Sequence, residues 1–369
     1  MTEKIVCTPL GVPQVLKWPR KPEDLPPREE TVVRLKVPDA YAVNSRRQEE
    51  VADAVAELTS MGFYGETSRK KAIARKRGKI DYDNPATQAL MEKVENVIAW
   101  LERVPTAKAL AVIYDPKVHD PEMSEAVRTW VTYLLDGIGI RSRAKVMQRL
   151  ILEEWYKGRK EGHSESQRWL SLACGAAQPV IQLLGQIKSG QFGKAGQLPR
   201  CTLVDLDRGA LQLAKGYADA SKVADAVMIR PGNILADRFY AEIEGVFDVV
   251  EAVGFFEYLS ASPEEFQYNG VVDARARVRS TAGDFLRNAY QAVAPGGLLV
   301  IGNMLDTHPQ LGFTLNVVQW PHIQPRSMEE MCRIIHSSLG TAPEDVTIYA
   351  PNDGVYALYA IRKPENSVQ

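Results

Sequence analysis

Hydrophobic residues recur along this chain at two different spacings, and the change from one spacing to the other divides it. In the first half they recur every three or four positions, which is the spacing of helices that bury one face. The spacing predicts helices over residues 43–61, 87–104, 122–135 and 141–157. Proline recurs through the first 40 residues, which predicts an extended arm laid over another surface rather than a helix.

The second half of the chain contains short apolar runs that are typical of buried strands, with helical stretches between them. The runs lie at residues 169–173, 201–205, 226–229, 247–252 and 297–302. Strands that alternate with helices form a parallel sheet with right-handed crossovers. The last two apolar runs, residues 346–350 and 355–361, are joined only by a short turn and predict an antiparallel hairpin.

The change of spacing predicts two domains. The length of 369 residues agrees with this, because it exceeds the usual size of one domain. We place the junction in the short polar stretch of residues 162–167. Residues 1–162 are expected to form a mainly helical domain that includes the proline-rich arm, and residues 163–369 an α/β domain.

The composition is that of a soluble globular protein, with 45% hydrophobic and 25% charged residues. The 45 basic and 46 acidic side chains nearly cancel, so the chain as a whole does not attract nucleic acid or an anionic membrane surface. No apolar run approaches the length of about 20 residues that spans a bilayer, and residues 1–10 lack the apolar core of a signal peptide. We expect a cytoplasmic protein that does not associate with a membrane. Both a monomer and a homo-oligomer are compatible with this composition.

Cysteine and histidine are too scattered to form a recognisable metal site. The four cysteines form no CxxC pair, and the five histidines show no HExxH spacing. We therefore predict neither a metal ion nor a disulfide framework. Cys174 is interpreted as a packing residue, because no histidine lies near it in the sequence.

The ends of the predicted strands carry the residues that could bind a ligand. In an open parallel sheet, ligands bind beyond the carboxyl ends of the strands. The first strand is followed by the small residues 173–177, which let a ligand approach the backbone. The second strand ends at Asp205, whose carboxylate can accept hydrogen bonds from ribose hydroxyls, whereas Asp207 is better placed to cap the next helix. Asn233 follows the third strand, where it is either a ligand contact or a turn residue.

This ordered set of motifs resembles the class I S-adenosylmethionine-dependent methyltransferases over roughly residues 165–369. A narrower resemblance is to the bacterial methyltransferases of extracellular-factor 3-hydroxypalmitic acid methyl ester biosynthesis. It is carried by residues 170–175, 203–207, 254–259, 301–303 and 320–331. The resemblance implies a Rossmann-like seven-stranded sheet with a C-terminal antiparallel hairpin, and S-adenosyl-L-methionine as the cofactor.

The chain departs from the family pattern in its first strand and the loop after it. Ser171 stands where most members carry an acidic residue, and Ala173 and Ala177 replace glycines. The serine is shared with the narrower group. The positions that match the family's cofactor contacts are Ser171, Ala173, Gly175, Asp205, Asp207, Asn233 and Ala252.

A cofactor of this kind needs little acid or base chemistry from the protein, because its methyl group is already activated by the sulfonium. The resemblance favours a small-molecule acceptor that is methylated on oxygen. A carboxylate acceptor needs no general base, whereas a hydroxyl needs one, and the candidates by position are Glu257, Tyr258 and His322. The candidates for acceptor binding, beneath a lid formed by the helical domain, are Arg141, Phe255, Trp320 and Arg326.

Two other functions stay open at this point. An RNA or protein methyltransferase could dock through the basic run of residues 69–79, although a solvated surface explains that run as well. A non-catalytic protein that keeps the fold could bind the cofactor without turnover, because the loop after the first strand is altered.

Overall fold

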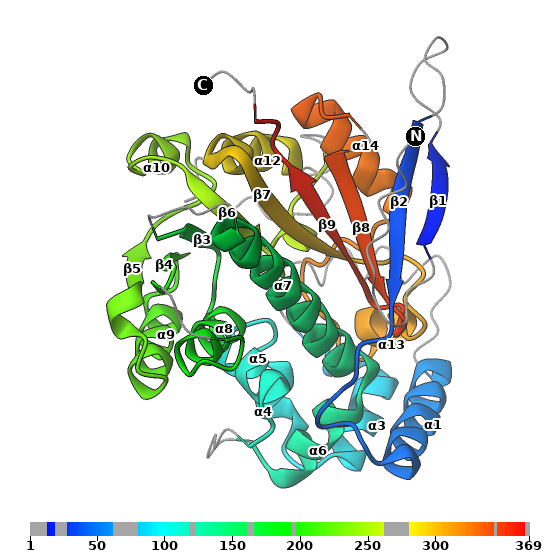
Figure 1. The fold of residues 1–369 in the computed structure, drawn as a ribbon. Helices are drawn as coiled ribbons and strands as arrows, with labels where there is room; N and C mark the ends of the chain where they lie inside the picture. The colour runs from blue at the N-terminus through cyan, green and yellow to red at the C-terminus, as the bar shows by residue number, and fades with distance from the viewer. Residues whose placement is uncertain are drawn as a thin grey trace.

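A nine-stranded sheet forms the centre of the computed structural model (Figure 1). The structure describes residues 13–18, 28–61, 80–117, 123–160, 166–193, 197–261, 280–342 and 345–365. The strand order is β1-β2-β8-β9-β7-β6-β3-β4-β5. The strands are β1 (Pro13–Trp18), β2 (Arg28–Leu35), β3 (Arg168–Leu172), β4 (Arg200–Asp205), β5 (Val227–Pro231), β6 (Phe247–Ala252), β7 (Val293–Met304), β8 (Val346–Pro351) and β9 (Tyr356–Arg362).

The pairing of the strands confirms the predicted α/β fold. Strands β3 to β7 pair in parallel with one another, whereas β9 runs antiparallel between β7 and β8. This gives the predicted parallel core with a C-terminal antiparallel hairpin. The order in which strands are added changes direction at β3. Strands β4 and β5 lie on one side of it, and the later strand β6 lies on the other. Such a switch in strand order opens a crevice for a ligand at the carboxyl ends of the strands.

The N-terminal segment adds two strands to this sheet. The sequence predicts an extended arm lying over another surface, but β2 pairs in parallel with the edge strand β8, and β1 pairs antiparallel with β2. The backbone of the arm is extended as expected. Edge pairing is favoured because the exposed side of β8 offers unpaired backbone groups.

The helices differ in places from the ranges that the sequence predicts. They are α1 (Ser45–Met61), α3 (Pro85–Lys93), α4 (Val97–Leu101), α5 (Ala107–Tyr114), α6 (Glu125–Tyr133), α7 (Leu135–Lys160), α8 (Gln178–Lys188), α9 (Arg208–Ala220), α10 (Asp237–Ala241), α12 (Ala282–Gln291), α13 (Leu311–Asn316) and α14 (Met328–Leu339). The predicted helix 87–104 is two helices, because Asn96 between them adopts a left-handed conformation. Helix α6 begins only at Glu125, where Ser124 caps it by accepting a hydrogen bond from the amide of Val127.

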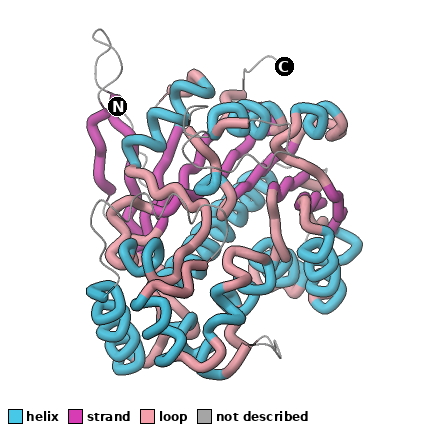
Figure 2. The backbone as a smooth tube through the Cα atoms, turned by 180° about the vertical axis from the view of Figure 1, so that it is seen from behind, coloured by secondary structure: helices cyan, strands magenta, loops and turns pink. Residues whose placement is uncertain are grey.

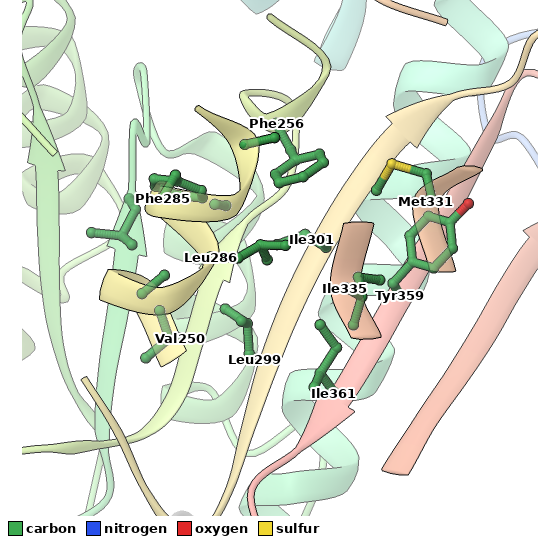
Figure 3. Close-up of a cluster of buried hydrophobic side chains, with 14 of the residues drawn as sticks. Val250, Phe256, Phe285, Leu286, Leu299, Ile301, Met331, Ile335, Tyr359 and Ile361 are labelled. Carbon is green, nitrogen blue, oxygen red and sulfur yellow. The ribbon is translucent and has the colours of Figure 1, made fainter. Parts of the chain in front are cut away.

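Both faces of the sheet are covered by helices. Figure 3 shows one face, where Phe285 of α12 and Ile335 of α14 lie over the strands that carry Val250 and Ile301. Helices α7, α8 and α9 cover the other face around Trp169. Neighbouring residues of one strand point to opposite faces, so both faces of the sheet bury apolar side chains. Each fully buried side chain contributes about 1.5–3 kcal/mol to stability.

The remaining N-terminal helices form a second apolar cluster with residues of the C-terminal part. Figure 2 shows the strands together in one half of the molecule and many of the helices in the other. Trp100, Trp130 and Phe313 lie in this cluster, and Thr314 donates hydrogen bonds to Asp136 at the start of α7. The arrowheads of β2 and β8 point toward this group of helices (Figure 1). The helices therefore lie at the carboxyl ends of the parallel strands.

The predicted domain boundary near residue 162 falls in residues 161–165, outside the described residues. Helix α7 contacts the N-terminal helices α5 and α6 as well as β8 and β9 of the sheet. The division into two domains stays a prediction. Among the described residues, no helix is both long and apolar enough to cross a membrane.

Candidate functional site

The loop after β3 has the backbone shape of a glycine-rich turn although two of its glycines are replaced. Ala173, Gly175 and Ala177 have φ angles of +48°, +54° and +49°. A left-handed residue other than glycine costs roughly 1–2 kcal/mol, so the two alanines keep this conformation against a local preference. The amide of Cys174 donates to the carbonyl of Val204, which ties the loop to β4 at 3.0 Å. The loop therefore keeps its small residues close to the end of the sheet.

Asp205 at the end of β4 holds this loop in place. Its Oδ2 accepts a hydrogen bond from the amide of Gly175 at 2.8 Å, and its Oδ1 accepts one from the amide of Asp207 at 2.8 Å. A carboxylate has about four acceptor positions, so two remain for a ligand. The side chain of the next residue, Leu206, is 72% exposed. An acceptor group and an apolar surface thus lie side by side at this strand end.

The other predicted cofactor contacts on this side are placed as follows. Asp207 caps α9, because its Oδ1 accepts a hydrogen bond from the amide of Gly209 at 2.7 Å; this confirms its predicted capping role. Asn233 follows β5 and accepts a hydrogen bond from the amide of Leu235 at 3.0 Å, which is the geometry of an Asx turn. Ala252 is buried at the end of β6. Whether Asn233, Asp207 and Ala252 also contact a cofactor stays a prediction.

A small cavity of about 70 Å³ lies between the loop after β3, the end of β6 and two N-terminal helices. Gly175 and Gly254 line it from the sheet side, Tyr114 from α5 and Arg143 from α7. Gly175 lies directly below α5, because a Cβ built there would make an ordinary van der Waals contact of 3.8 Å with the Cβ of Ala107. Residues of α5 and α7 therefore cover the loop, and the role of the helical part as a lid stays a prediction.

Glu251 lines the same cavity and was not recognised from the sequence. It is the register partner of Ser171 across β3 and β6, and the hydroxyl of Ser171 donates to its Oε1. The amide of Val253 donates to its Oε2 at 2.9 Å. Burial raises the pKa of Glu251 to about 7, although these two hydrogen bonds and the charge of Arg143 act in the opposite direction. The one signal in the sequence was an acidic residue inside an otherwise apolar strand.

Arg143 is a second residue of the cavity that the sequence did not single out. Its side chain is 2% exposed, and its Nη1 donates to both oxygens of Glu257, at 3.0 and 3.3 Å. The guanidinium carbon lies 4.3 Å from the centre of the Tyr356 ring. Its Nε is buried and has no hydrogen-bond partner among the described residues. A Cβ at Gly254 would lie only 2.7 Å from Nη2, so a glycine is required beside this side chain.

The three predicted catalytic residues line neither the small cavity nor the larger one between α7, α8 and α9. The carboxylate of Glu257 is fully buried and paired with Arg143; burial raises its pKa, and Arg143 acts in the opposite direction. The hydroxyl of Tyr258 accepts a hydrogen bond from Nε1 of Trp320 at 2.8 Å. Burial raises the pKa of Tyr258, which makes its hydroxyl harder to ionise. His322 is half-buried in a loop, with a left-handed φ of +61°.

The predicted acceptor-binding arginines use their guanidinium groups within the chain. Arg141 donates to both oxygens of Asp39 and to the carbonyls of Ile113 and Thr132. Arg326 donates to Asn303 at 3.1 Å and to the carbonyl of Leu259. Both arginines therefore hold the fold together where they lie, and their roles in acceptor binding stay predictions.

The two aromatic acceptor-binding candidates are packing residues in this structure. Phe255 contacts Phe285 edge to face, with 5.5 Å between the ring centres. Trp320 is buried in the N-terminal apolar cluster, with its Nε1 bound to the hydroxyl of Tyr258. Their part in acceptor binding also stays a prediction. The thiol of Cys174 suits its interpretation as a packing residue, because burial, reinforced by Asp205 and Glu251, raises its pKa well above the ordinary value.

A larger cavity of about 590 Å³ opens beside the small one, between α7, α8 and α9. Tyr41, Asp115, Lys145 and Tyr217 are among its lining residues, and Tyr114 lines both cavities. Cavities of this volume are typical of small-molecule sites. Among the described residues, no group of three or more His, Cys, Asp or Glu side chains is arranged to hold a metal ion.

Comparison with known proteins gives a likeness of fold. No family model matches the sequence, and no curated protein does. A solved structure described as a possible exported protein from Bordetella parapertussis superimposes with a TM-score of 0.51 at 15% identity, over 88% of this chain and 100% of that one. The parallel core and antiparallel hairpin are those that the sequence resemblance implies. The chain has the class I methyltransferase fold.

Several other solved structures that match are described as methyltransferases. An O-methyltransferase family protein from Burkholderia thailandensis matches at 17% identity and a TM-score of 0.44, over 76% of this chain and 77% of that one. The N-methyltransferase NodS from Bradyrhizobium japonicum, in complex with S-adenosyl-L-homocysteine, matches at 17% identity and a TM-score of 0.35, over 60% of this chain and 87% of that one. These values describe a distant similarity.

Proposed function

We propose that this chain is an S-adenosylmethionine-dependent methyltransferase that acts on a small molecule. The observation that carries the proposal is the loop after β3, whose left-handed residues are fixed by Asp205 at the switch in strand order. A loop without bulky side chains, beside a carboxylate with free acceptor positions, suits the ribose and the sulfonium of that cofactor. The exposed side chain of Leu206 offers an apolar surface for its adenine ring.

The residues of the chain bind, orient and exclude water, because S-adenosylmethionine supplies an already activated methyl group when bound. Asp205 and the loop fix the nucleoside end. Helices α5 and α7 close over the loop and keep solvent away from the reacting atoms. A dry site favours a reaction in which opposite charges neutralise one another.

We propose a carboxylate as the methyl acceptor. A carboxylate attacks without a general base, whereas a hydroxyl acceptor would require one. Tyr258 is a poor base here, because burial raises its pKa, and Glu257 is already paired with Arg143. The narrower sequence resemblance, to methyltransferases of 3-hydroxypalmitic acid methyl ester biosynthesis, favours the same acceptor class.

The larger cavity is the proposed acceptor site. Its volume of about 590 Å³ suits a small organic acid, and Lys145 supplies a positive charge in its wall. Tyr114 is common to both cavities, so an acceptor there would lie next to the cofactor loop. The basic run of residues 69–79, on which an RNA or protein acceptor would dock, lies outside the described residues. The cytoplasmic location and the homo-oligomeric state stay predictions.

Transfer of a radiolabelled methyl group tests this function. The chain is incubated with labelled S-adenosylmethionine and separate pools of carboxylic acids, alcohols, RNA and protein. We expect label in the carboxylic acid pool as a base-labile methyl ester. Label only in RNA or protein would overturn the small-molecule proposal, and tight cofactor binding without transfer to any pool would favour a non-catalytic binding protein.

A further inference from the structure

Two buried side chains of opposite charge line the small cavity. Arg143 reaches it from α7 and Glu251 from the end of β6, and both residues are more than nine-tenths buried. We propose that Arg143 and Glu251 together form a receptor for an α-amino acid group, with Arg143 binding the carboxylate and Glu251 the ammonium. This inference rests on the proposed function, since that group would be the methionine end of the cofactor.

The guanidinium of Arg143 has one edge in use and one edge available. Glu257 accepts both of its hydrogen bonds from Nη1, and Nε is buried without a partner among the described residues. A buried polar group without a partner is unfavourable, and a ligand carboxylate would supply the missing acceptor. The edge formed by Nε and Nη2 matches a carboxylate with two parallel hydrogen bonds. Nη2 lies close to Gly254, which lines the cavity.

Glu251 provides the complementary charge. Ser171 and the amide of Val253 each donate to one of its oxygens and hold the carboxylate in a fixed orientation. Two acceptor positions remain, and an ammonium group has three donors. Most class I members carry an acidic residue at the position of Ser171. In this chain the carboxylate comes instead from the register partner of Ser171 on the neighbouring strand.

An α-amino acid suits this cavity better than a dicarboxylate or a diamine. Arg143 and Glu257 neutralise one another, so the ionised Glu251 leaves one net negative charge in the buried site. A dicarboxylate would increase that negative charge and a diamine would leave Nε of Arg143 without an acceptor, whereas a zwitterion gives both side chains a partner and adds no net charge. The volume of about 70 Å³ holds a head group rather than a whole nucleoside, which agrees with the nucleoside lying outside, at Asp205.

Two ligands that share the nucleoside but differ in the amino acid group test the receptor. S-adenosylhomocysteine carries this group, whereas 5′-methylthioadenosine lacks it. Affinities for both are measured by calorimetry with the wild-type chain and with the variants Glu251→Gln and Arg143→Lys. Glu251→Gln conserves the shape of the side chain and removes its charge. Arg143→Lys keeps the positive charge opposite Glu257 but loses the pair of N–H donors that can bind a carboxylate with two hydrogen bonds.

We expect each variant to bind S-adenosylhomocysteine roughly ten- to a hundredfold more weakly, because each loses a charge-assisted contact. The affinity for 5′-methylthioadenosine should not change. The matched control is Asp205→Asn, which should weaken both ligands by a similar factor because both carry the ribose. If the Glu251 and Arg143 variants lost affinity equally for both ligands, or lost affinity for neither, the proposed receptor would be wrong.

The test separates this inference from the function on which it rests. If the wild-type chain binds neither ligand, the proposed function fails. If it binds both ligands equally well, only the receptor fails. Should Arg143→Lys not fold, S-adenosylhomocysteine is compared with its analogue lacking the amino group. The wild type should prefer the parent compound by roughly ten- to a hundredfold and Glu251→Gln should not; a preference that persists in the variant would overturn the role of Glu251.

Discussion

The two ends of the candidate cofactor site are built in opposite ways. At the open end, Asp205 is half-buried and is held by amides two residues and thirty residues away along the chain. At the closed end, Arg143 and Glu251 are buried and come from segments more than 100 residues apart. An exposed carboxylate is stabilised by water, whereas a buried one depends on its protein partners. Changes at the closed end should therefore affect stability and binding together, and changes at the open end mainly binding.

The largest expected effect is at the closed end. Arg143→Met leaves the carboxylate of Glu257 buried without its cation, which should lower the free energy of unfolding by about 3–5 kcal/mol. Denaturant unfolding measures this loss. The double variant Arg143→Met with Glu257→Gln removes both charges and should recover much of it. If the single and double variants were equally unstable, the ion pair would not be the cause.

The second prediction concerns pH. The pKa of Glu251 is about 7 in the folded chain and near 4.5 in the unfolded chain, so the folded state holds its proton more tightly. The free energy of unfolding should therefore fall as the pH rises from about 4.5 through 7, by on the order of 3 kcal/mol in total. The groups around this carboxyl are the Ser171 hydroxyl, Arg143, and the thiols of Cys174 and Cys201.

Glu251→Gln isolates this contribution. We expect the variant to be more stable than the wild type at pH 8 and to lose most of the pH dependence between pH 5 and 8. Denaturant unfolding at several pH values gives the difference between the two curves. A wild-type curve parallel to that of the variant would show that Glu251 does not titrate in this range.

At the open end, Asp205→Ala should weaken the binding of S-adenosylhomocysteine by roughly ten- to a hundredfold, because the ribose loses a charge-assisted hydrogen bond worth about 1.5–3 kcal/mol. The chain should still fold, since Asp205 is half-buried. Calorimetry measures the affinity and denaturant unfolding the stability. Unchanged affinity would remove Asp205 from the binding site.

The smallest expected effect separates the two neighbouring aspartates. Asp207→Ala removes the cap of α9 and should lower stability by about 1 kcal/mol with little change in cofactor affinity. Thermal unfolding and calorimetry on the same preparation give both numbers. If Asp207→Ala impaired binding and Asp205→Ala impaired only stability, their roles would be exchanged.

The open end could be predicted from the sequence because its signals are local. Asp205 ends an apolar run, and Asp207 stands one position before a helix, so strand and cap rules are enough to place both. The order of strands and the terminal hairpin follow from the same short-range patterns. The left-handed alanines of the loop could not be predicted, because Asp205 and β4 impose a conformation that alanine alone disfavours.

The closed end could not be predicted because it exists only after folding. Glu251 meets Ser171 through strand register, and Arg143 meets Glu257 through the packing of α7 on the sheet. The same reason explains why Arg141 was predicted to bind the acceptor although it is paired within the chain. No local pattern in the sequence shows that Asp39 binds its guanidinium. The pairing of β2 with β8 likewise joins segments from the two ends of the chain.

Titration calorimetry of the wild-type chain with S-adenosylhomocysteine and with NAD, each at pH 8, tests the central claim most directly. Both ligands contain adenosine, and only the first has the amino acid group that the closed end is proposed to bind. The account predicts saturable binding of S-adenosylhomocysteine at one site per chain and no comparable binding of NAD. Binding of NAD without binding of S-adenosylhomocysteine would contradict it.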